Sequence, residues 1–255
     1  MTSITTMAPS PTAPQAASPQ NDAAATPPEM DQAFLIRAVE LQGQGQEQEA
    51  ERLFRLYLGV HPHDPIALYS LAVILLKRGD LATALPLLEQ GTQRNPGFAP
   101  LWAAYASAQQ ATGLRDEALA SYDKALAAKP DYIEALVNSG ALLRESHQHL
   151  AALERFNKVL TINPNYESAL GNCAILLTEF KRSEQAIAMF QRLLSINPRY
   201  DYGLGLLSYE RLHACDWTDF DSSSAAIVQG VRAGERVCKS LGFMALSDSA
   251  ADHQR

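Results

Sequence analysis

The chain has 255 residues, a formal net charge of −7 and a pI near 5.4, with 47% hydrophobic and 19% charged residues. Such a composition is typical of soluble globular proteins, and its acidic balance leaves no basic surplus to neutralise nucleic-acid phosphates. No stretch of about 18 apolar residues could cross a bilayer, and the first thirty residues lack the positive and apolar regions of a secretory signal. We therefore expect a cytoplasmic protein that binds neither nucleic acid nor a membrane.

Residues 1–30 consist mainly of Pro, Ala, Ser, Thr and Gln, with few large apolar side chains. Such a segment cannot bury enough apolar surface to offset the entropy of ordering it. It is predicted to be a disordered tail.

From residue 31 to residue 200 the sequence repeats every 34 residues. The repeat is marked by five prolines at this interval: Pro62, Pro96, Pro130, Pro164 and Pro198. With that proline as position 32, the repeats span 31–64, 65–98, 99–132, 133–166 and 167–200. Position 20 is alanine in all five repeats: Ala50, Ala84, Ala118, Ala152 and Ala186. The register therefore holds over the whole segment without an insertion.

The other repeated positions predict two antiparallel helices, A and B, in each repeat. Small residues at positions 8 and 20 let the two backbones approach, while large apolar residues at positions 4 and 24 fill the space beside them. Position 15, where the chain reverses, is Gly45, Gly79 and Gly113 in the first three repeats. Glycine reaches the left-handed conformation there without a Cβ penalty. His147 and Lys181 replace it in the last two repeats, so we expect those turns to be strained or built differently.

Over residues 31–200 these positions resemble the tetratricopeptide-repeat family. The resemblance implies an all-α fold, a right-handed superhelical solenoid of five repeats plus a partial sixth, with a concave groove lined largely by A helices. Proteins of this kind hold another protein or an extended polypeptide. The stacking faces at the ends of the array also allow a homo-oligomer.

Asn138 and Asn172 occupy position 6 of helix A in the fourth and fifth repeats. An amide side chain offers a donor and an acceptor, so a column of them can bind the backbone of an extended peptide. The alternative is that both are ordinary solvated residues, since Ser70 and Ala104 do not continue the column. Positions 5 and 9 carry no cation in repeats two to five, which disfavours a clamp for a terminal carboxylate. Asn138 and Asn172 are our predicted peptide-binding residues.

Residues 201–255 begin like a sixth repeat, but position 20 is Phe220 and the pattern is lost. Residues 213–221 then read His-Ala-Cys-Asp-Trp-Thr-Asp-Phe-Asp. With the segment from Gly242 to Ser249, this resembles the junction of bacterial SPINDLY-like O-linked N-acetylglucosamine transferases, over residues 210–255. In that family an asparagine ladder holds the polypeptide substrate. The resemblance implies that Trp217 packs as an anchor and that Asp219 or Asp221 caps the next helix.

The catalytic part of that family is a two-lobed, UDP-sugar-binding glycosyltransferase that follows the junction. The 55 residues from 201 to 255 are too few for two Rossmann-like lobes. We therefore predict no catalytic and no cofactor-binding residues, and expect the chain to be inactive alone. Our interpretation is a polypeptide-recognising arm of a protein O-GlcNAc transferase-like protein. The alternative is an independent scaffold or adaptor unrelated to glycosylation.

No metal site is predicted either. The histidine pairs His61/His63 and His147/His149 are each two residues apart, and helical residues at this spacing do not share a face. The sequence has three widely spaced cysteines: Cys173, Cys215 and Cys238. Without a Cys-x-x-Cys pair they indicate reduced thiols rather than a zinc site or a disulfide.

Overall fold

The structure is a computed structural model that describes residues 27–239, and this part is helical without a strand. The all-α prediction is confirmed. The predicted tail lies mostly outside the described residues, but α1 begins at Pro27, inside it, because proline suits the first turn of a helix. The helices are α1 (Pro27–Gly43), α2 (Glu47–Val60), α3 (Pro65–Lys77), α4 (Leu81–Arg94), α5 (Ala99–Ala111), α6 (Arg115–Ala128), α7 (Ile133–Glu145), α8 (His149–Ile162), α9 (Glu167–Glu179), α10 (Ser183–Ile196), α11 (Gly203–His213) and α12 (Phe220–Arg232).

Short turns join the helices into consecutive pairs, so that each A helix runs antiparallel to the B helix after it. The alanines at position 20 are completely buried in all five pairs. Gly140, at position 8 of α7, shows how close the approach is. A Cβ placed on it would lie 3.0 Å from the ring of Phe156, the buried position-24 residue of α8. Small residues therefore set the distance between the helices, and large ones fill the space beside it.

The turn at position 15 has the same backbone geometry in all five pairs. Gly45, Gly79 and Gly113 have φ values of 76°, 78° and 83°. His147 (φ 58°) and Lys181 (φ 59°) adopt the same left-handed conformation in the last two. Of the two expected outcomes, strain is therefore the one observed. A residue with a side chain loses about 1–2 kcal/mol of stability in the left-handed conformation.

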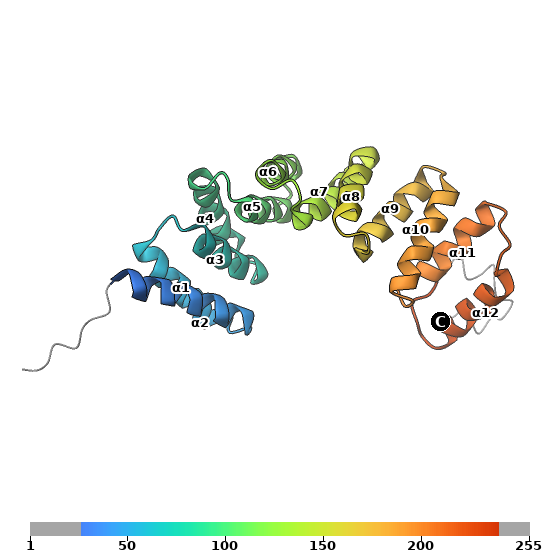
Figure 1. Ribbon diagram of the computed structural model, residues 1–255, viewed down its shortest axis with the longest axis horizontal. Helices are drawn as coiled ribbons and strands as arrows, with labels where there is room; N and C mark the ends of the chain where they lie inside the picture. Colours follow the sequence, from blue (N-terminus) through green and yellow to red (C-terminus); the bar gives the residue numbers. More distant parts are fainter. Residues whose placement is uncertain (1–26, 240–255) are drawn as a thin grey trace, which may run out of the picture.

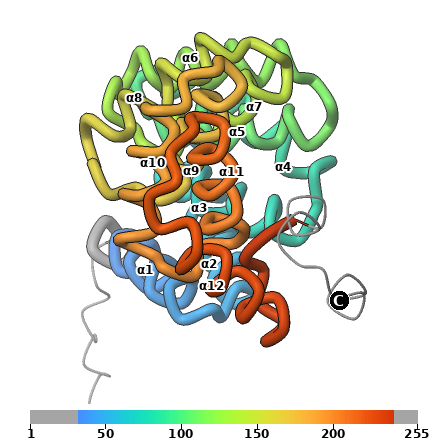
Figure 2. The backbone as a smooth tube through the Cα atoms, turned by 90° about the vertical axis from the view of Figure 1, so that its right-hand side faces the viewer, coloured from blue at the N-terminus to red at the C-terminus, as the bar shows by residue number. Residues whose placement is uncertain are grey.

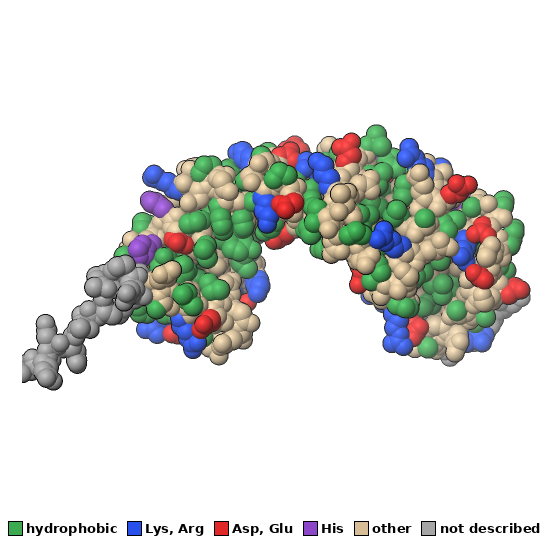
Figure 3. Space-filling model, in the orientation of Figure 1, with side chains coloured by type: hydrophobic (Ala, Val, Ile, Leu, Met, Phe, Trp, Pro, Cys, Tyr) green, Lys and Arg blue, Asp and Glu red, His purple; other side chains and the backbone are tan. Residues whose placement is uncertain are grey.

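The pairs stack into an arch (Figure 1), as in the solenoid predicted from the sequence. Successive A helices contact each other directly, in the pairs α3–α5, α5–α7 and α7–α9. Viewed along the long axis, the backbone winds round, with α6 to α8 on one side and both ends of the array on the other (Figure 2). The space-filling view shows a hollow beneath the middle repeats (Figure 3). Direct contact between A helices places them on the shorter, inner side of this curve.

The sixth unit is built differently. After α12 the chain turns back, and residues 235–239 lie across the start of α11; we call this segment the C-terminal clasp. The N–H of Tyr202 donates to the carbonyl of Arg236 (2.5 Å), and the N–H of Gly205 donates to that of Val237 (2.9 Å). These bonds satisfy donors that a helix start leaves unpaired.

Candidate peptide-binding groove

Asn138 in α7 and Asn172 in α9 are both partly exposed on the inner helices. The residues at position 6 of the two preceding A helices, Ser70 and Ala104, are buried. The two predicted peptide-binding residues are therefore adjacent members of one column that both reach the surface, as the apolar Ile36 does at the same position of the first repeat.

The two amide side chains differ in the hydrogen bonds that they make within the protein. Asn172 Nδ2 donates to the carbonyl of Ser168, one turn earlier in α9 (2.7 Å), and this bond involves only its donor. Asn138 lies beside the buried hydroxyl of Tyr122. Burial raises the pKa of Tyr122 above its ordinary value, and hydrogen bonds with Ser107 and Asn138 offset part of the increase. Asn138 is thus held at its position by the core, whereas Asn172 is held by its own helix.

Three aromatic side chains pack together where α3 meets the starts of α5 and α7, and the sequence analysis missed them. Tyr69 of α3 packs edge-to-face on Phe98, with ring centroids 6.4 Å apart, and it interacts with the hydroxyl of Tyr132. We call Tyr69, Phe98 and Tyr132 the aromatic ledge. All three are half-buried. The signal was present, because position 34 is aromatic in four repeats: Phe98, Tyr132, Tyr166 and Tyr200.

One charge of each sign lies beside Tyr132, because the ammonium of Lys129 is 5.6 Å from the centroid of its ring. The hydroxyl of Tyr132 donates to Glu134 Oε2 (2.7 Å). Burial and this carboxylate together raise the pKa of Tyr132 far above its ordinary value. Burial also raises the pKa of Tyr69, and the charge of Glu134 adds to the effect. Both phenols therefore stay protonated and remain hydrogen-bond donors at any physiological pH.

Tyr200 closes the groove next to Asn172. Gly171 is at position 5, and a Cβ placed on it would lie 2.6 Å from the Tyr200 hydroxyl oxygen. The tyrosine thus occupies the space that a side chain at position 5 would take. Burial raises the pKa of Tyr200, the nearby Glu167 raises it further, and Arg144 lowers it. The charges of Glu167 and Arg144 thus have opposite effects on the Tyr200 hydroxyl.

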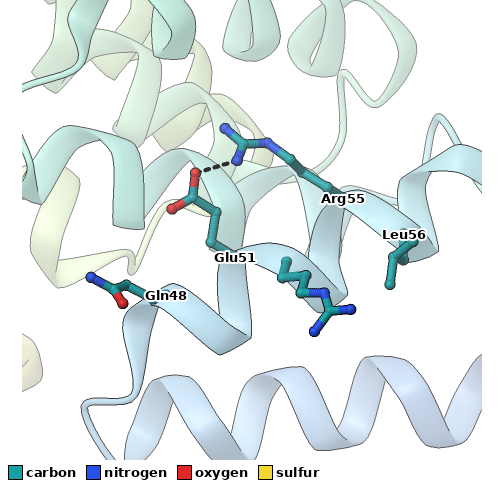
Figure 4. Close-up of a pocket in the computed structure, with 5 residues that line it drawn as sticks. Gln48, Glu51, Arg55 and Leu56 are labelled. Atoms are coloured by element: carbon teal, nitrogen blue, oxygen red, sulfur yellow. Dashed lines mark ion pairs between the residues drawn. The ribbon is translucent and has the colours of Figure 1, made fainter.

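A pocket of about 340 Å³ lies on α2, away from the amides (Figure 4). It is lined by Gln48, Glu51, Arg52, Arg55 and Leu56. The nearly buried carboxylate of Glu51 is already paired with Arg55 (2.5 Å) and with Arg78 at the end of α3 (2.8 Å). These pairs tie the first repeat to the second, so the charges here already have a structural role.

The junction motif forms a compact turn around Arg211. This side chain is 12% exposed, and its guanidinium donates to the carbonyl of Thr218 (3.1 Å) and lies 3.7 Å from carboxylate oxygens of Asp216 and Asp219. Hydrogen bonds from Thr218 lower the pKa of Asp216. The turn is therefore well defined by the motif residues themselves.

Two expectations for this motif were wrong. Trp217 is 64% exposed and contacts Phe220 edge-to-face at 5.5 Å, rather than packing as an anchor. Asp219 stands at the N-cap of α12 but makes no side-chain capping bond, because its backbone is left-handed (φ 56°). Asp221 lies inside the first turn of α12. The segment from Gly242 onward, which carries the rest of the resemblance, lies outside the described residues.

The residues between 27 and 239 contain no group of three or more His, Cys, Asp and Glu arranged to hold a metal ion. His149 Nδ1 instead pairs with Glu179 Oε2 (2.6 Å), between the fourth and fifth repeats. All three cysteines are free thiols, and burial raises the pKa of Cys173 to about 12. Within the same range, no helix combines the length and the apolar character that a bilayer crossing needs.

Comparison with known proteins agrees with this geometry. Models of the tetratricopeptide repeat match residues 37–100, 75–139 and 143–208, whereas no curated protein matches the sequence. Among solved structures, PilF of Pseudomonas aeruginosa has a TM-score of 0.71 at 17% identity, over 86% of this chain and 96% of its own. YrrB, described as a repeat protein with an unusual peptide-binding site, has a TM-score of 0.61 at 13% identity, over 79% and 95%. MamA has a TM-score of 0.56 at 17% identity, over 68% and 94%. This chain belongs to the tetratricopeptide-repeat family.

Proposed function

We propose that this protein is a scaffold that holds an extended polypeptide in its concave groove, with Asn138 and Asn172 binding the polypeptide backbone. The observation that supports this most is the pair itself: two partly exposed amides at the same position of neighbouring inner helices. The residues at that position in the second and third repeats are buried. An extended backbone presents N–H and C=O groups at regular intervals, and an amide side chain can bind both. Binding of this kind depends little on the ligand's sequence.

The free atoms of the pair fit this role. Asn172 uses its donor on Ser168, so its carbonyl oxygen is the group left for a ligand N–H. Asn138 is oriented by Tyr122, so little side-chain entropy is lost when a ligand binds it. YrrB, which has the same fold, is described as having a peptide-binding site, and this supports a peptide as the class of ligand.

The test is a peptide-array screen of the full chain, followed by titration of the best extended peptides against the Asn138→Ala/Asn172→Ala variant. Losing two neutral hydrogen bonds of about 1 kcal/mol each should weaken binding by tenfold or more. The matched control is Asn165→Ala, which removes an exposed amide from the α8–α9 connection and should leave affinity unchanged. Equal affinities of the double variant and the unmodified chain would refute the role of the pair.

A second, narrower candidate is that this scaffold is the recognition arm of a protein O-GlcNAc transferase-like protein. It rests on residues 213–221, whose turn presents the exposed Trp217 as a surface that a following domain could cover. The reading frame beyond codon 255 tests it: two Rossmann-like lobes there would support the arm, and an unrelated continuation would favour the independent scaffold. A cytoplasmic location belongs to the same proposal and is supported by the three free thiols.

A further inference from the structure

We infer that the aromatic ledge binds a proline-rich segment in the polyproline II conformation, and that its occupant is residues 9–19 of this chain. The inference rests on the proposed function, because it assigns part of the same groove to one class of polypeptide. It begins from the placement of the three rings. Tyr69 lies in the second turn of α3, Phe98 is the N-cap of α5, and Tyr132 is the N-cap of α7. Each ring therefore comes from a different inner helix.

The three rings form one continuous surface. The ring centroids of Tyr69 and Phe98 are 6.4 Å apart, and Tyr69 also interacts with the hydroxyl of Tyr132. A polyproline II helix has three residues per turn and rises about 9 Å per turn. A segment of about one to two turns can therefore lie across the whole ledge.

The chemistry of the ledge also favours proline. Aromatic grooves bind proline-rich segments because the rigid ring stacks on flat apolar surface and loses little entropy on binding. The single O–H of Tyr132 already donates to Glu134, so Tyr132 would contact the ligand with the face of its ring. Glu134 accepts from the hydroxyl of Tyr132, and the ammonium of Lys129 lies 5.6 Å from the centroid of the same ring. One charge of each sign therefore lies beside the ledge, which suits an uncharged ligand.

The chain carries a segment with these properties. Four prolines fall within residues 9–19, at positions 9, 11, 14 and 19, and Pro11 and Pro14 have the three-residue spacing. No charged side chain occurs before Asp22. These residues lie outside the described part of the structure.

The attachment point is on the correct edge of the solenoid. Because each B helix runs antiparallel to its A helix, α1, α3, α5 and α7 all start at the same edge, and the ledge lies at the starts of α3, α5 and α7. The chain enters α1 at Pro27, on that edge. From Pro14 to Pro27 the chain advances 13 residues, or about 40 Å at 3.1 Å per residue. This length exceeds three helix spacings of about 8–10 Å each.

The experiment measures anisotropy of a labelled peptide with the sequence of residues 8–20, added to the full chain. In a tail variant, the prolines at positions 9, 11, 14 and 19 are replaced by alanine, which removes the internal competitor. We expect this variant to bind the peptide at least tenfold more tightly than the unmodified chain. Adding Tyr132→Ala to the variant should weaken binding about tenfold, and adding Tyr132→Phe, which keeps the ring, should weaken it much less. Trp217→Ala, an exposed aromatic outside the ledge, is the matched control and should have no effect.

Three results would overturn the inference. No binding of the labelled peptide to the tail variant would exclude proline-rich ligands, and equal affinity for the tail variant and the unmodified chain would exclude residues 9–19 as the occupant. Unchanged binding after Tyr132→Ala would exclude the ledge as the binding site. If circular dichroism shows that this variant is misfolded, Phe98→Ala is used for the same measurement. The proposed function is tested separately. It would stand with any of these results if other peptides still bind in a way that depends on Asn138 and Asn172.

Discussion

The repeats up to residue 200 and the unit formed by α11 and α12 achieve stability in two ways. In the repeats, an alanine inside each B helix lets the two helices meet and a large buried residue such as Phe156 fills the interface. In the last unit, Phe220 stands where that alanine should be, and it begins α12 rather than lying within it. Backbone hydrogen bonds from the C-terminal clasp then hold the start of α11. The difference shows that side-chain size, rather than helix propensity, determines the hairpin.

The largest expected effect is a difference in the free energy of unfolding between variants that lose an aromatic ring in the repeats and in the last unit. Phe156→Ala removes a fully buried ring from the fourth repeat and should lower the free energy of unfolding by about 3–5 kcal/mol. Trp217→Ala removes an exposed ring from the junction turn and should change it by less than about 0.5 kcal/mol. Urea denaturation followed by circular dichroism measures both. A comparable loss in the two variants would show that the junction is part of the core.

The fold could be predicted from the sequence because each repeated position can be checked in five repeats. Five occurrences of Ala at position 20 and of Pro at position 32 fix the register, and each has a physical reason that holds in every pair. The turn at Lys181 shows the limit of this reasoning: the sequence indicated strain or a different geometry, and the backbone keeps the repeat geometry. Stacking on both sides over-determines that turn, so the residue adapts to the fold.

The second prediction tests the clasp. A Cβ on Gly205 would lie 2.9 Å from the Cα of Cys238 and 2.9 Å from the carbonyl oxygen of Val237, and backbone atoms cannot turn away as a side chain can. Gly205→Ala should displace the clasp at a cost of about 1–3 kcal/mol and speed hydrogen exchange at the Tyr202 and Gly205 positions. Gly59→Ala is the control, since its Cβ meets no atom within 4 Å and the change should improve helix propensity.

The candidate site was less predictable than the fold. The column of Asn138 and Asn172 is visible because both occupy one repeat position, but their exposure relative to Ser70 and Ala104 requires the structure. The aromatic ledge was missed because Tyr69 is at position 5 while Phe98 and Tyr132 are at position 34. A contact between different columns of neighbouring repeats leaves no periodic signal of its own.

The smallest effect concerns the strained turns. Lys181→Gly should relieve the left-handed strain at φ 59°, which is worth about 1–2 kcal/mol. The greater backbone freedom of glycine in the unfolded chain offsets about 0.5–1 kcal/mol of this gain. The net stabilisation of about 0.5–1 kcal/mol should raise the Tm by about 2 °C in a domain of this size. Gly113→Ala, at the same position of the third repeat with φ 83°, should lower the Tm. If Lys181→Gly also lowered it, the lysine side chain would have to stabilise the turn by more than its backbone conformation costs, and the equivalence of the five turns would be limited to their geometry.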